Sequence, residues 1–267
     1  MTDNQNTKRM AAVTGASGAI GQALVAGLAD KNFKVILLVR DPQKGIETIS
    51  RIKDVNIKAD LEYRKVDLSN QSDIKSLADS WNTKLNVLIN NAAITPPTRE
   101  TTKQGIELQF ATNVLGYYWM IEYFSDILQA SAPARVVNVA SYWAGGLDLK
   151  DLEFKSRPYN NHDAYRQSKQ ANRMLTRVQA AQYDPAEVSI NACHPGDVNS
   201  KLSNSLGFGG SQSPEKGAIT PIWLATSGDL ANISGKYFES RKEVQCQFSS
   251  NLTACEDLYK MCQRYKI

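Results

Sequence analysis

The sequence has few of the residues that mark metal-binding or disulfide-rich chains. Its 267 residues include four cysteines and two histidines. No two cysteines form a Cys-x-x-Cys pair, and none has zinc-ligand spacing with a histidine, so we expect no metal. Cys255 and Cys262 stand seven residues apart, on what reads as one face of a C-terminal helix. All four, including Cys193 and Cys246, are better explained as free thiols than as a disulfide or metal site.

Long apolar runs are also missing. No run approaches the ~20 residues that a membrane span requires. The N-terminal segment MTDNQNTKRM is polar and lacks the apolar core of a signal peptide. We therefore expect no membrane span and a reducing, cytoplasmic compartment. No Pro/Gly/Ser linker, repeat or low-complexity tract divides residues 1–267, so a single domain is expected.

The charge balance argues against nucleic acid as a partner. The formal net charge is +4, and the basic residues are not clustered. Apolar residues make up 42% of the chain and charged residues 22%, which is ordinary for a soluble globular protein. No Ser-His-Asp grouping points to a hydrolase. A small-molecule substrate is the remaining expectation.

Short apolar runs alternate with longer helical patterns through the first 195 residues. The strand candidates are 10–13, 35–39, 63–66, 87–89, 135–139 and 188–192. The helical patterns are 19–31, 43–53, 70–81, 103–130 and 163–183. Most apolar runs are continuous, as expected for parallel strands that are covered on both faces. The alternation predicts an α/β fold with right-handed crossovers, a doubly wound parallel sheet with helices on both faces.

A glycine-rich turn follows the first predicted strand. In Thr14-Gly-Ala-Ser-Gly-Ala-Ile-Gly21, Gly15 permits a tight turn and Gly18 allows the backbone to approach a pyrophosphate. Gly21 permits close packing of helix against strand. The N-terminus of the following helix would offer free N–H groups and the positive end of its dipole to phosphates. This placement predicts a dinucleotide site.

Further motifs follow in order along the chain. They are Asn90-Asn91-Ala92-Ala93, Asn113 in Thr-Asn-Val-Leu-Gly, Ser141 after the fifth strand, Tyr165-x-x-x-Lys169, and His194-Pro195-Gly196 after the sixth strand. With these motifs the sequence resembles the short-chain dehydrogenases/reductases over almost its whole length. Ala93 replaces the glycine that the family has in its Asn-Asn-Ala-Gly turn. The resemblance implies a single Rossmann-type sheet with strand order 3-2-1-4-5-6-7.

Within the family the sequence is most similar to retinol dehydrogenase-like enzymes and related carbonyl reductases. The similar segments are Leu-Val-Arg-Asp at 38–41, Ala164 to Asn172, and Ile-Ser-Gly-Lys-Tyr-Phe at 233–238. The implied activity is interconversion of a carbonyl and an alcohol with NADP(H). Two alternatives stay open: an epimerase or dehydratase of the same fold, and a regulatory protein that binds NADP(H) without turnover.

The resemblance also implies site residues. The catalytic set is Asn113, Ser141, Tyr165 and Lys169. The cofactor-binding set is Gly15, Ser17, Gly18, Ala19, Ile20, Arg40, Asp67, Leu68, Asn91, Ala92, Tyr165, Lys169, Pro195, Gly196 and Val198. Asp67 matches the family position that binds the adenine amino group, although an aspartate that stabilises a helix N-terminus would look the same. His194 shapes the backbone beside the nicotinamide, and His162 is expected in a solvated loop.

Tyr165 and Lys169 are four residues apart and share one helix face. An unperturbed phenol has a pKa near ~10 and is a poor base at neutral pH. We expect the Lys169 ammonium, together with an oxidised nicotinamide, to lower the pKa of Tyr165 so that it serves as the general acid/base. By resemblance, Ser141 binds the substrate oxygen and Asn113 holds a water that relays protons toward Lys169.

The end of the second strand predicts the choice of cofactor. An NAD-selective site usually has an Asp or Glu there, which binds the ribose 2′-hydroxyl. This chain has Val39 followed by Arg40, and a guanidinium suits a 2′-phosphate. NADP(H) is therefore the expected cofactor.

Three loops should surround the nicotinamide face with mostly apolar side chains. The segments 142–147, 154–159 and 202–208 supply Trp143, Leu147, Phe154, Tyr159, Leu202, Leu206 and Phe208. Of these we assign Trp143, Tyr159, Leu202 and Phe208, together with Asp197, to the substrate. Asp197, where relatives have an apolar residue, either touches substrate or caps the following segment. The Gly/Ser-rich part of segment 197–213 predicts a lid.

The helical pattern 103–130 has more aromatic side chains than one buried helix face requires. They are Tyr117, Tyr118, Trp119, Tyr123 and Phe124. In the family, this helix and the one that carries Tyr165 commonly form a four-helix interface. We therefore expect a homodimer or homotetramer.

Overall fold

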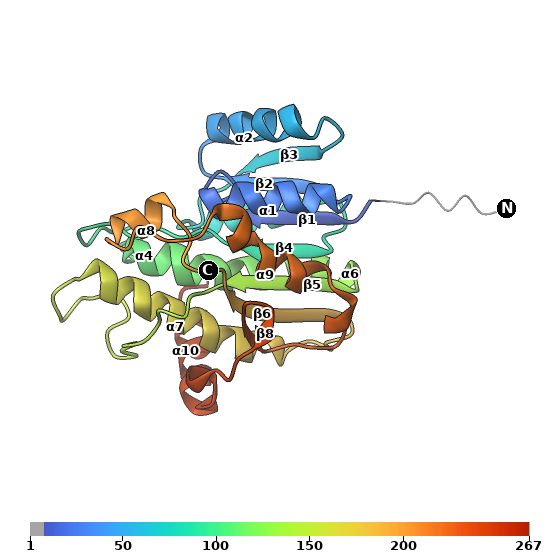
Figure 1. Ribbon diagram of the computed structural model, residues 1–267. Coiled ribbons are helices and arrows are strands. Elements are labelled where there is room, and N and C mark those ends of the chain that lie inside the picture. The colour runs from blue at the N-terminus through green and yellow to red at the C-terminus, as the bar shows by residue number, and fades with distance from the viewer. Residues whose placement is uncertain (1–7, 267) are drawn as a thin grey trace.

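An eight-stranded sheet runs through the centre of the protein, in the order β3-β2-β1-β4-β5-β6-β7-β8 (Figure 1). The computed structural model describes residues 8–266. The strand pairs from β3 through β7 are parallel, and β7 pairs with β8 in antiparallel fashion. The predicted doubly wound fold and the order of its first seven strands are confirmed. The edge strand β8 was not expected.

The first six strands lie close to their predicted positions. The strands are β1 Met10–Thr14, β2 Lys34–Val39, β3 Asp60–Lys65, β4 Val87–Asn90, β5 Ala134–Val139, β6 Val188–His194, β7 Tyr237–Glu239 and β8 Lys242–Glu243. The largest displacement is in β3, which begins three residues before the predicted start. As the other edge strand, β3 has partly exposed, polar side chains along most of its length. A search for apolar runs therefore does not detect where β3 begins.

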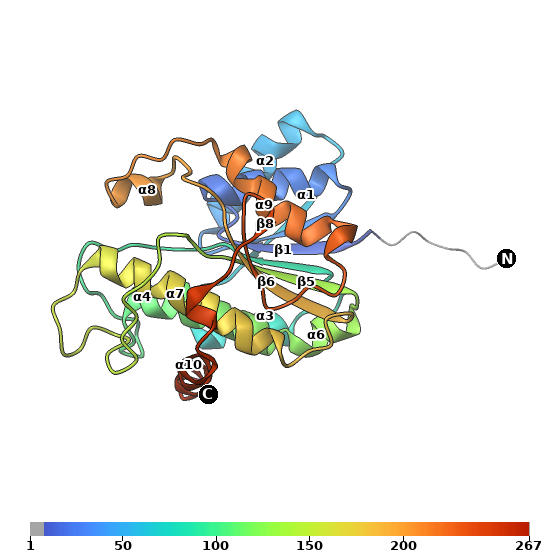
Figure 2. The same ribbon diagram turned by 60° about the horizontal axis from the view of Figure 1, so that its bottom comes forward.

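Helices cover both faces of the sheet (Figure 2). The face with α1 (Ala19–Asp30), α2 (Pro42–Val55) and α9 (Pro214–Thr226) is opposite the face with α3 (Gln71–Asp79) and α7 (Asn161–Ala180). The remaining helices are α4 Leu108–Phe110, α5 Gly116–Tyr123, α6 Ser125–Ala130, α8 Lys201–Ser205 and α10 Leu252–Gln263. Each face has its own cluster of buried aliphatic and aromatic side chains. Because the strands from β3 to β7 are parallel, their carboxyl ends lie at the same edge of the sheet, and the loops that follow them meet there.

The single helix expected over 103–130 is wrong in its start and its continuity. Residues 101–107 form a turn in which Gly105 has a φ of +80°, and α4 begins only at Leu108. The segment Ala111–Leu115 is a π-helix, which is a frequent feature of functional sites. The Asn113 side chain occupies the middle of this wider turn, so a tertiary contact interrupts the α-helix.

The aromatic surplus on α5 is explained by burial within this chain. Tyr117, Tyr118, Trp119 and Phe124 are each at most 2% exposed. The C-terminal helix α10 packs against α7, and the ring of its Tyr259 meets that of Tyr118, edge to face, at 5.5 Å between centroids. The premise that these four aromatics await a partner subunit is wrong, because they are buried within this chain; Phe124, for example, meets Trp81 edge to face at 5.2 Å between centroids.

The four cysteines are free thiols, and Cys255 and Cys262 lie fully buried on one face of α10, as predicted. Cys193 is also buried, whereas Cys246 is partly exposed. Within residues 8–266, no group of three or more His, Cys, Asp or Glu side chains is placed to hold a metal ion. Over the same residues, no helix is long and apolar enough to cross a membrane.

Candidate active site

The glycine turn after β1 is packed too tightly for side chains. Gly15 has a φ of +61°, and a Cβ atom there would lie 2.8 Å from the Cα atom of Ala92. A Cβ on Gly21 would lie 2.2 Å from the carbonyl oxygen of Gly15. Both positions therefore require glycine. The turn brings the start of α1 close to the end of β4.

The N-terminus of α1 is left open by its own sequence. The N-cap residue Gly18 provides no side-chain cap. In contrast, side chains cap α2, α3, α7, α9 and α10, through Asp41, Asn70, Asn160, Ser213 and Asn251 respectively. The first N–H groups of α1 thus remain available to an anion. This geometry fits the pyrophosphate of a dinucleotide.

Asn91 braces the turn from the neighbouring strand. Its side-chain nitrogen donates to the carbonyl oxygen of Thr14 at 2.9 Å, and its backbone N–H donates to Thr14 Oγ1 at 2.8 Å. The backbone N–H of Ala92 donates to the same hydroxyl at 3.1 Å. Asn91 and Ala92, predicted to bind the cofactor, therefore also hold the loop that would receive it.

The other predicted cofactor residues lie at the same carboxyl edge of the sheet. Arg40 follows β2, is exposed, and takes part in no ion pair among the described residues. Asp67 accepts hydrogen bonds from the backbone N–H and the hydroxyl of Ser69 through Oδ1, while Asn70 caps α3. Leu68 and Val198 are buried. Ser17, Ala19, Ile20, Pro195 and Gly196 are partly or fully exposed.

Ser141, Tyr165 and Lys169 converge where β5 ends against α7. Ser141 Oγ accepts the backbone N–H of Trp143 at 3.0 Å, so its own hydrogen is free to point elsewhere. Lys169 is 2% exposed, and its Nζ donates to the carbonyl oxygen of Val139 at 2.9 Å. The Tyr165 ring lies 5.6 Å from that Nζ. The predicted catalytic side chains are thus in contact range of one another.

Lys169 alone does not lower the pKa of Tyr165. Burial raises the pKa of Tyr165 to about 12, and a hydrogen bond with Ser141 offsets this only in part. Burial also lowers the pKa of Lys169 to about 7, so at neutral pH Lys169 is no longer fully charged. A buried amine at this pKa is a weaker electrostatic partner than a permanent ammonium. In this arrangement Tyr165 is a neutral phenol, a state suited to donating a proton.

Asn113 is fully engaged with the loop after β4. Its Oδ1 accepts the N–H of Ile94 at 2.9 Å, and its Nδ2 donates to the carbonyl of the same residue at 3.0 Å. Nδ2 also lies 3.3 Å from Ser168 Oγ. The side chain thereby fixes the distance between the cofactor loop and α7. A water relay through Asn113 stays a prediction.

Gln109 is a residue that the sequence reasoning missed. It is fully buried, and its amide fits with the nitrogen donating to the Ile94 carbonyl at 2.7 Å and the oxygen accepting the Tyr165 N–H at 3.2 Å. It therefore ties the same loop to the first turn of α7. Its position four residues before Asn113, on the same helical face, is the signal that would have identified it.

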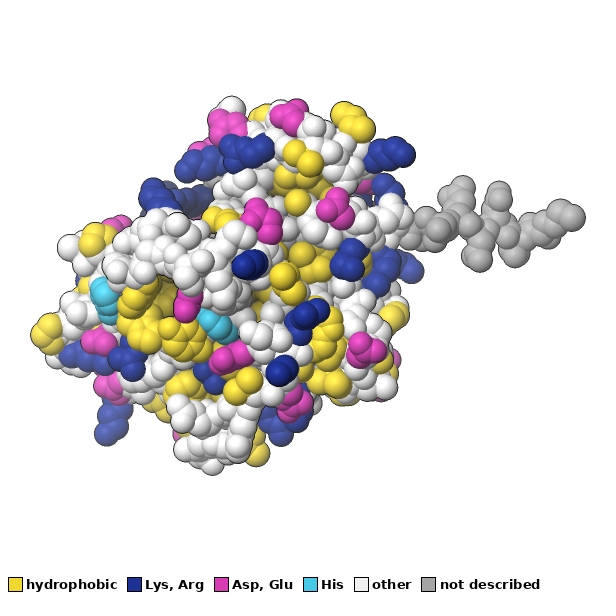
Figure 3. Space-filling view, viewed as in Figure 1, with side chains coloured by type: hydrophobic (Ala, Val, Ile, Leu, Met, Phe, Trp, Pro, Cys, Tyr) yellow, Lys and Arg dark blue, Asp and Glu magenta, His cyan; other side chains and the backbone are white. Residues whose placement is uncertain are grey.

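An aromatic cluster lines the space beside Tyr165. The Trp143 ring lies 4.4 Å from Phe208, 5.6 Å from His162 and 5.8 Å from Tyr165, measured between centroids. Figure 3 shows the corresponding hollow, with apolar side chains gathered on its floor and histidines at its edge. His162, expected in a solvated loop, instead lies in the first turn of α7 and packs on this cluster.

Not every residue predicted to line the cleft does so. Phe154 and Leu206 are 4% and 2% exposed and pack beneath their own loops. The Tyr159 ring meets that of Phe154 edge to face, and its hydroxyl donates to the Pro96 carbonyl. Tyr159 is therefore held in the wall of the cleft. Asp197 is exposed and is not a helix cap.

The lid reaches across the cleft. Ser200 caps the lid helix α8 through a reciprocal capping box with Ser203, so a capping role for Asp197 is excluded. Ser205, at the end of α8, forms a hydroxyl–hydroxyl hydrogen bond of 2.8 Å with Thr95 on the opposite wall. Leu202 is partly buried in the same helix. The predicted lid segment thus includes a short helix that is hydrogen-bonded to the loop after β4.

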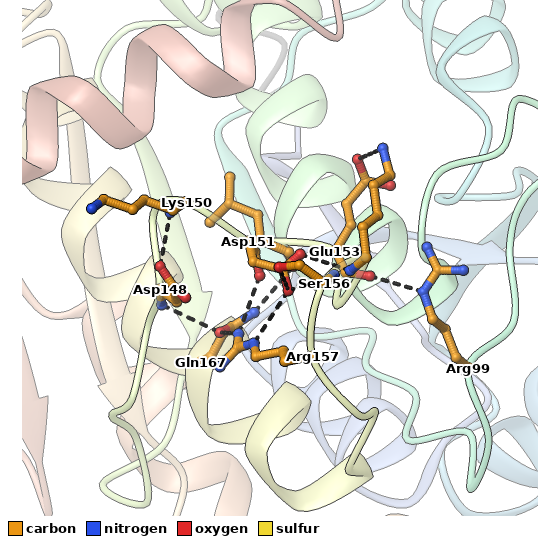
Figure 4. A network of polar contacts seen from close by, with 10 residues as sticks. Arg99, Asp148, Lys150, Asp151, Glu153, Ser156, Arg157 and Gln167 are labelled. Carbon is orange, nitrogen blue, oxygen red and sulfur yellow. Dashed lines mark hydrogen bonds and ion pairs between the residues drawn. The ribbon is translucent and has the colours of Figure 1, made fainter.

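A buried polar network shapes the loop between β5 and α7 (Figure 4). Asp151 accepts the N–H groups of Lys155 and Ser156 and the Ser156 hydroxyl, and it pairs with Arg157 at 3.6 Å. Arg157 also donates to the side-chain oxygen of Gln167 in α7. These bonds hold the pKa of Asp151 below its usual range although burial alone would raise it. The loop beside Trp143 is therefore held rigidly before any ligand arrives.

We expect Asp151→Asn to destabilise the protein by about 2 kcal/mol, because a buried carboxylate with several donors is replaced by a group that cannot accept them all. Urea unfolding at pH 7 measures this. The control Asp148→Asn alters a carboxylate that caps a single N–H, that of Lys150. Equal stability of both variants would contradict the role given to Asp151. Since the bonds favour the charged form, the difference should shrink as the pH falls through the lowered pKa of Asp151.

Comparisons with known proteins agree with this geometry. A family model described as short chain dehydrogenase matches residues 9–207. Retinol dehydrogenase 13 of Homo sapiens is 32% identical over 251 residues, covering 86% of this chain and 76% of the relative. A probable oxidoreductase of Streptomyces antibioticus is 30% identical, covering 90% and 87%. The crystal structure of an uncharacterised protein from Mycobacterium Paratuberculosis superimposes with a TM-score of 0.81 at 25% identity, covering 97% and 93% of the two chains.

Proposed function

Because this chain belongs to the short-chain dehydrogenase family, we propose that it interconverts a carbonyl compound and an alcohol with NADP(H), using Tyr165 as general acid/base. The observation that carries the proposal is that Ser141, Tyr165 and Lys169 converge at the same carboxyl edge of the sheet as the uncapped N-terminus of α1. The Gly15 turn and α1 would hold the pyrophosphate, and Lys169 would hold the nicotinamide ribose. When bound, the cofactor supplies or accepts the hydride.

The residues of this chain account for the proton side of the reaction. In the reductive direction the neutral Tyr165 hydroxyl donates its proton to the carbonyl oxygen as negative charge develops there. Ser141 donates a hydrogen bond to the same oxygen, since its Oγ already accepts the Trp143 N–H and its hydrogen is left over. Trp143, His162 and Phe208 exclude water from one side of the cleft. The rate of the reaction then increases because the substrate is held in one orientation and because Tyr165 and Ser141 donate to the oxygen on which charge develops.

Arg40 supports the choice of NADP(H) over NAD(H). Its exposed guanidinium follows β2 and is free of the ion pairs formed within residues 8–266, so it can bind a 2′-phosphate. We expect Arg40→Ala to raise the KM for NADPH by at least about 10-fold, the loss that one charge-assisted hydrogen bond implies. The KM for NADH should change little. The matched control is Arg241→Ala, which removes an exposed arginine at the distant turn between β7 and β8.

Wild-type catalytic efficiency with NADH equal to or above that with NADPH would overturn the cofactor assignment. No activity with either cofactor on a panel of carbonyls and alcohols would instead favour the sensing alternative. An epimerase or dehydratase would convert substrate without a net change in nicotinamide absorbance. One absorbance assay, with product analysis, therefore separates the three possibilities.

The aromatic cluster supports an apolar or partly aromatic substrate. Trp143 and Phe208 meet edge to face at 4.4 Å, and Phe208 is 56% exposed, so it can contact a ligand that enters under the lid. We expect Phe208→Ala to raise the KM for neutral apolar carbonyls ~10-fold, as the loss of about 1.4 kcal/mol of apolar contact implies. Turnover at saturation should be nearly unchanged. A consistent preference of the wild type for carboxylated or phosphorylated carbonyls would contradict the assignment.

A homodimer or homotetramer and a cytoplasmic location stay predictions. The surface of α5 and α7 named for the four-helix interface is in part covered by α10. An oligomer that used this surface would have to form on the part of it that α10 leaves free.

A further inference from the structure

Arg173 is a buried cation on the same helix as the catalytic pair. It lies in α7, one turn beyond Lys169, and is 7% exposed. No ion pair among residues 8–266 includes it. Its Nε donates to Cys246 Sγ at 3.3 Å, and its Nη1 donates to the backbone carbonyl of Ser141 at 3.4 Å. The guanidinium thus connects the catalytic serine to the segment that follows β8.

Two aromatic rings enclose this guanidinium. Its Cζ lies 3.6 Å from the centroid of the Tyr237 ring in β7 and 4.9 Å from that of Phe248. Such stacking suits the flat, weakly hydrated guanidinium better than an ammonium. The two rings and the two hydrogen-bond acceptors, Cys246 Sγ and the Ser141 carbonyl oxygen, therefore hold the Arg173 guanidinium in one orientation.

Placing this charge here is costly. Burying a cation without a carboxylate partner is unfavourable even after relaxation, and an apolar side chain of similar size is often the more stable choice. The backbone it holds is the point where β5 has ended at Val139 and the chain must still present Ser141 to the cleft. The carbonyl of Ser141 has no other partner among the hydrogen bonds that describe residues 8–266.

We propose that Arg173 is a positioning residue for Ser141: by clamping the serine's backbone carbonyl and Cys246 between Tyr237 and Phe248, it fixes the direction of the Ser141 hydroxyl. The inference rests on the proposed function, since it assigns a supporting residue to the same site. Arg173 touches neither substrate nor cofactor in this role. It acts through the backbone of the residue that does.

The first test compares three variants in the steady state. Arg173→Met removes the charge and both hydrogen bonds while filling similar space, and we expect kcat to fall by about 10-fold, with the KM for NADPH unchanged. Arg173→Lys should recover part of the loss, because an ammonium can reach one acceptor but not both. The control Arg177→Met removes an exposed arginine one turn further along α7 and should behave as wild type.

The second test needs no turnover. Cys246 is partly exposed, whereas Cys193, Cys255 and Cys262 are buried, so iodoacetamide should alkylate Cys246 selectively in the folded protein. Burial raises the pKa of the Cys246 thiol, but a hydrogen bond from Ser249 and the charge of Arg173 outweigh it and leave this pKa below its usual value. In Arg173→Met the midpoint of the alkylation-pH profile should move to higher pH.

The outcomes separate the two claims. If the wild type turns over and Arg173→Met matches it in kcat, or if the alkylation profile of the variant is unchanged, the positioning role is wrong. If the wild type turns over no carbonyl or alcohol with either nicotinamide, the proposed function is wrong. A loss of kcat in Arg173→Met that Arg173→Lys partly restores, together with the shifted alkylation profile, supports the proposal.

Discussion

Replacing Tyr165 by Phe should lower kcat by the ~10²–10⁴-fold typical of a lost general acid/base, with little change in fold or cofactor affinity. The substitution removes one hydroxyl and leaves the ring, which packs 5.8 Å from Trp143 between centroids. Because Ser141 still donates to the substrate oxygen, some turnover should remain. Stopped-flow measurement of nicotinamide absorbance in the presence of a carbonyl substrate measures the loss.

Tyr183→Phe is the matched control. Tyr183 follows the other end of α7, and its hydroxyl bonds to Ser125, away from the cleft. We expect wild-type kcat in this variant. Retention of most activity by a folded Tyr165→Phe protein would show that another group supplies the proton, and the proposed chemistry would have to be revised.

Lys169→Met should abolish most turnover and yet make the protein more stable. The lysine amine is buried with only the Val139 carbonyl as hydrogen-bond partner, and burial lowers its pKa to about 7. Methionine fills similar space without an amine to desolvate. At pH 7 and below, the gain in unfolding free energy should be on the order of 3 kcal/mol. Tyr117, whose hydroxyl also donates to Val139, limits the loss of that hydrogen bond.

The stability difference between the wild type and Lys169→Met should depend on pH. A lysine in the unfolded chain keeps a pKa near ~10.4, so between that value and about 7 the unfolded state binds more protons. The stability of the wild type should therefore fall as the pH is lowered through this window and then level off. The advantage of Lys169→Met should be greatest near pH 7 and vanish near pH 10. Urea unfolding of both proteins across this range, with the exposed Lys75→Met as control, decides the matter; a constant difference would contradict the explanation.

Local patterns predicted the parallel core of the fold well. The buried strands β1, β2 and β4 are nearly continuous apolar runs because helices cover both their faces, and β5 and β6 are buried although polar residues interrupt their apolar runs. The edge strands β3 and β8 are polar and partly exposed, so the same search misplaced one and missed the other. The π-helix around Asn113 could not be predicted, because it depends on the backbone of Ile94, nineteen residues away.

The candidate site was predictable where side chains follow a strand, as Ser141 follows β5, or share a helix face, as Tyr165 and Lys169 do in α7. The aromatic side chains of α5 were misread because elements distant in the sequence bury them: Tyr118, for example, meets Tyr259 of α10, which begins at Leu252, more than 100 residues later. Arg173 and Gln109 have no sequence signal beyond their helical spacing, since their roles depend on acceptors supplied by other elements.

The order of the strands also bears on how the chain folds. β1 pairs with β2 and, on its other side, with β4, where Ala12 lies opposite Leu88. Every pair from β3 to β7 is parallel, so none can begin as a local hairpin, and each needs a crossover to be in place first. Such non-local pairing slows folding. Among residues 8–266 the one antiparallel strand pair of the sheet is the hairpin β7–β8, which turns through Ser240 and Arg241, both with positive φ. It lies at the sheet edge, where it cannot nucleate the centre. Refolding from urea should therefore be slow and pass through partly collapsed species whose exposed strand edges favour aggregation at high protein concentration.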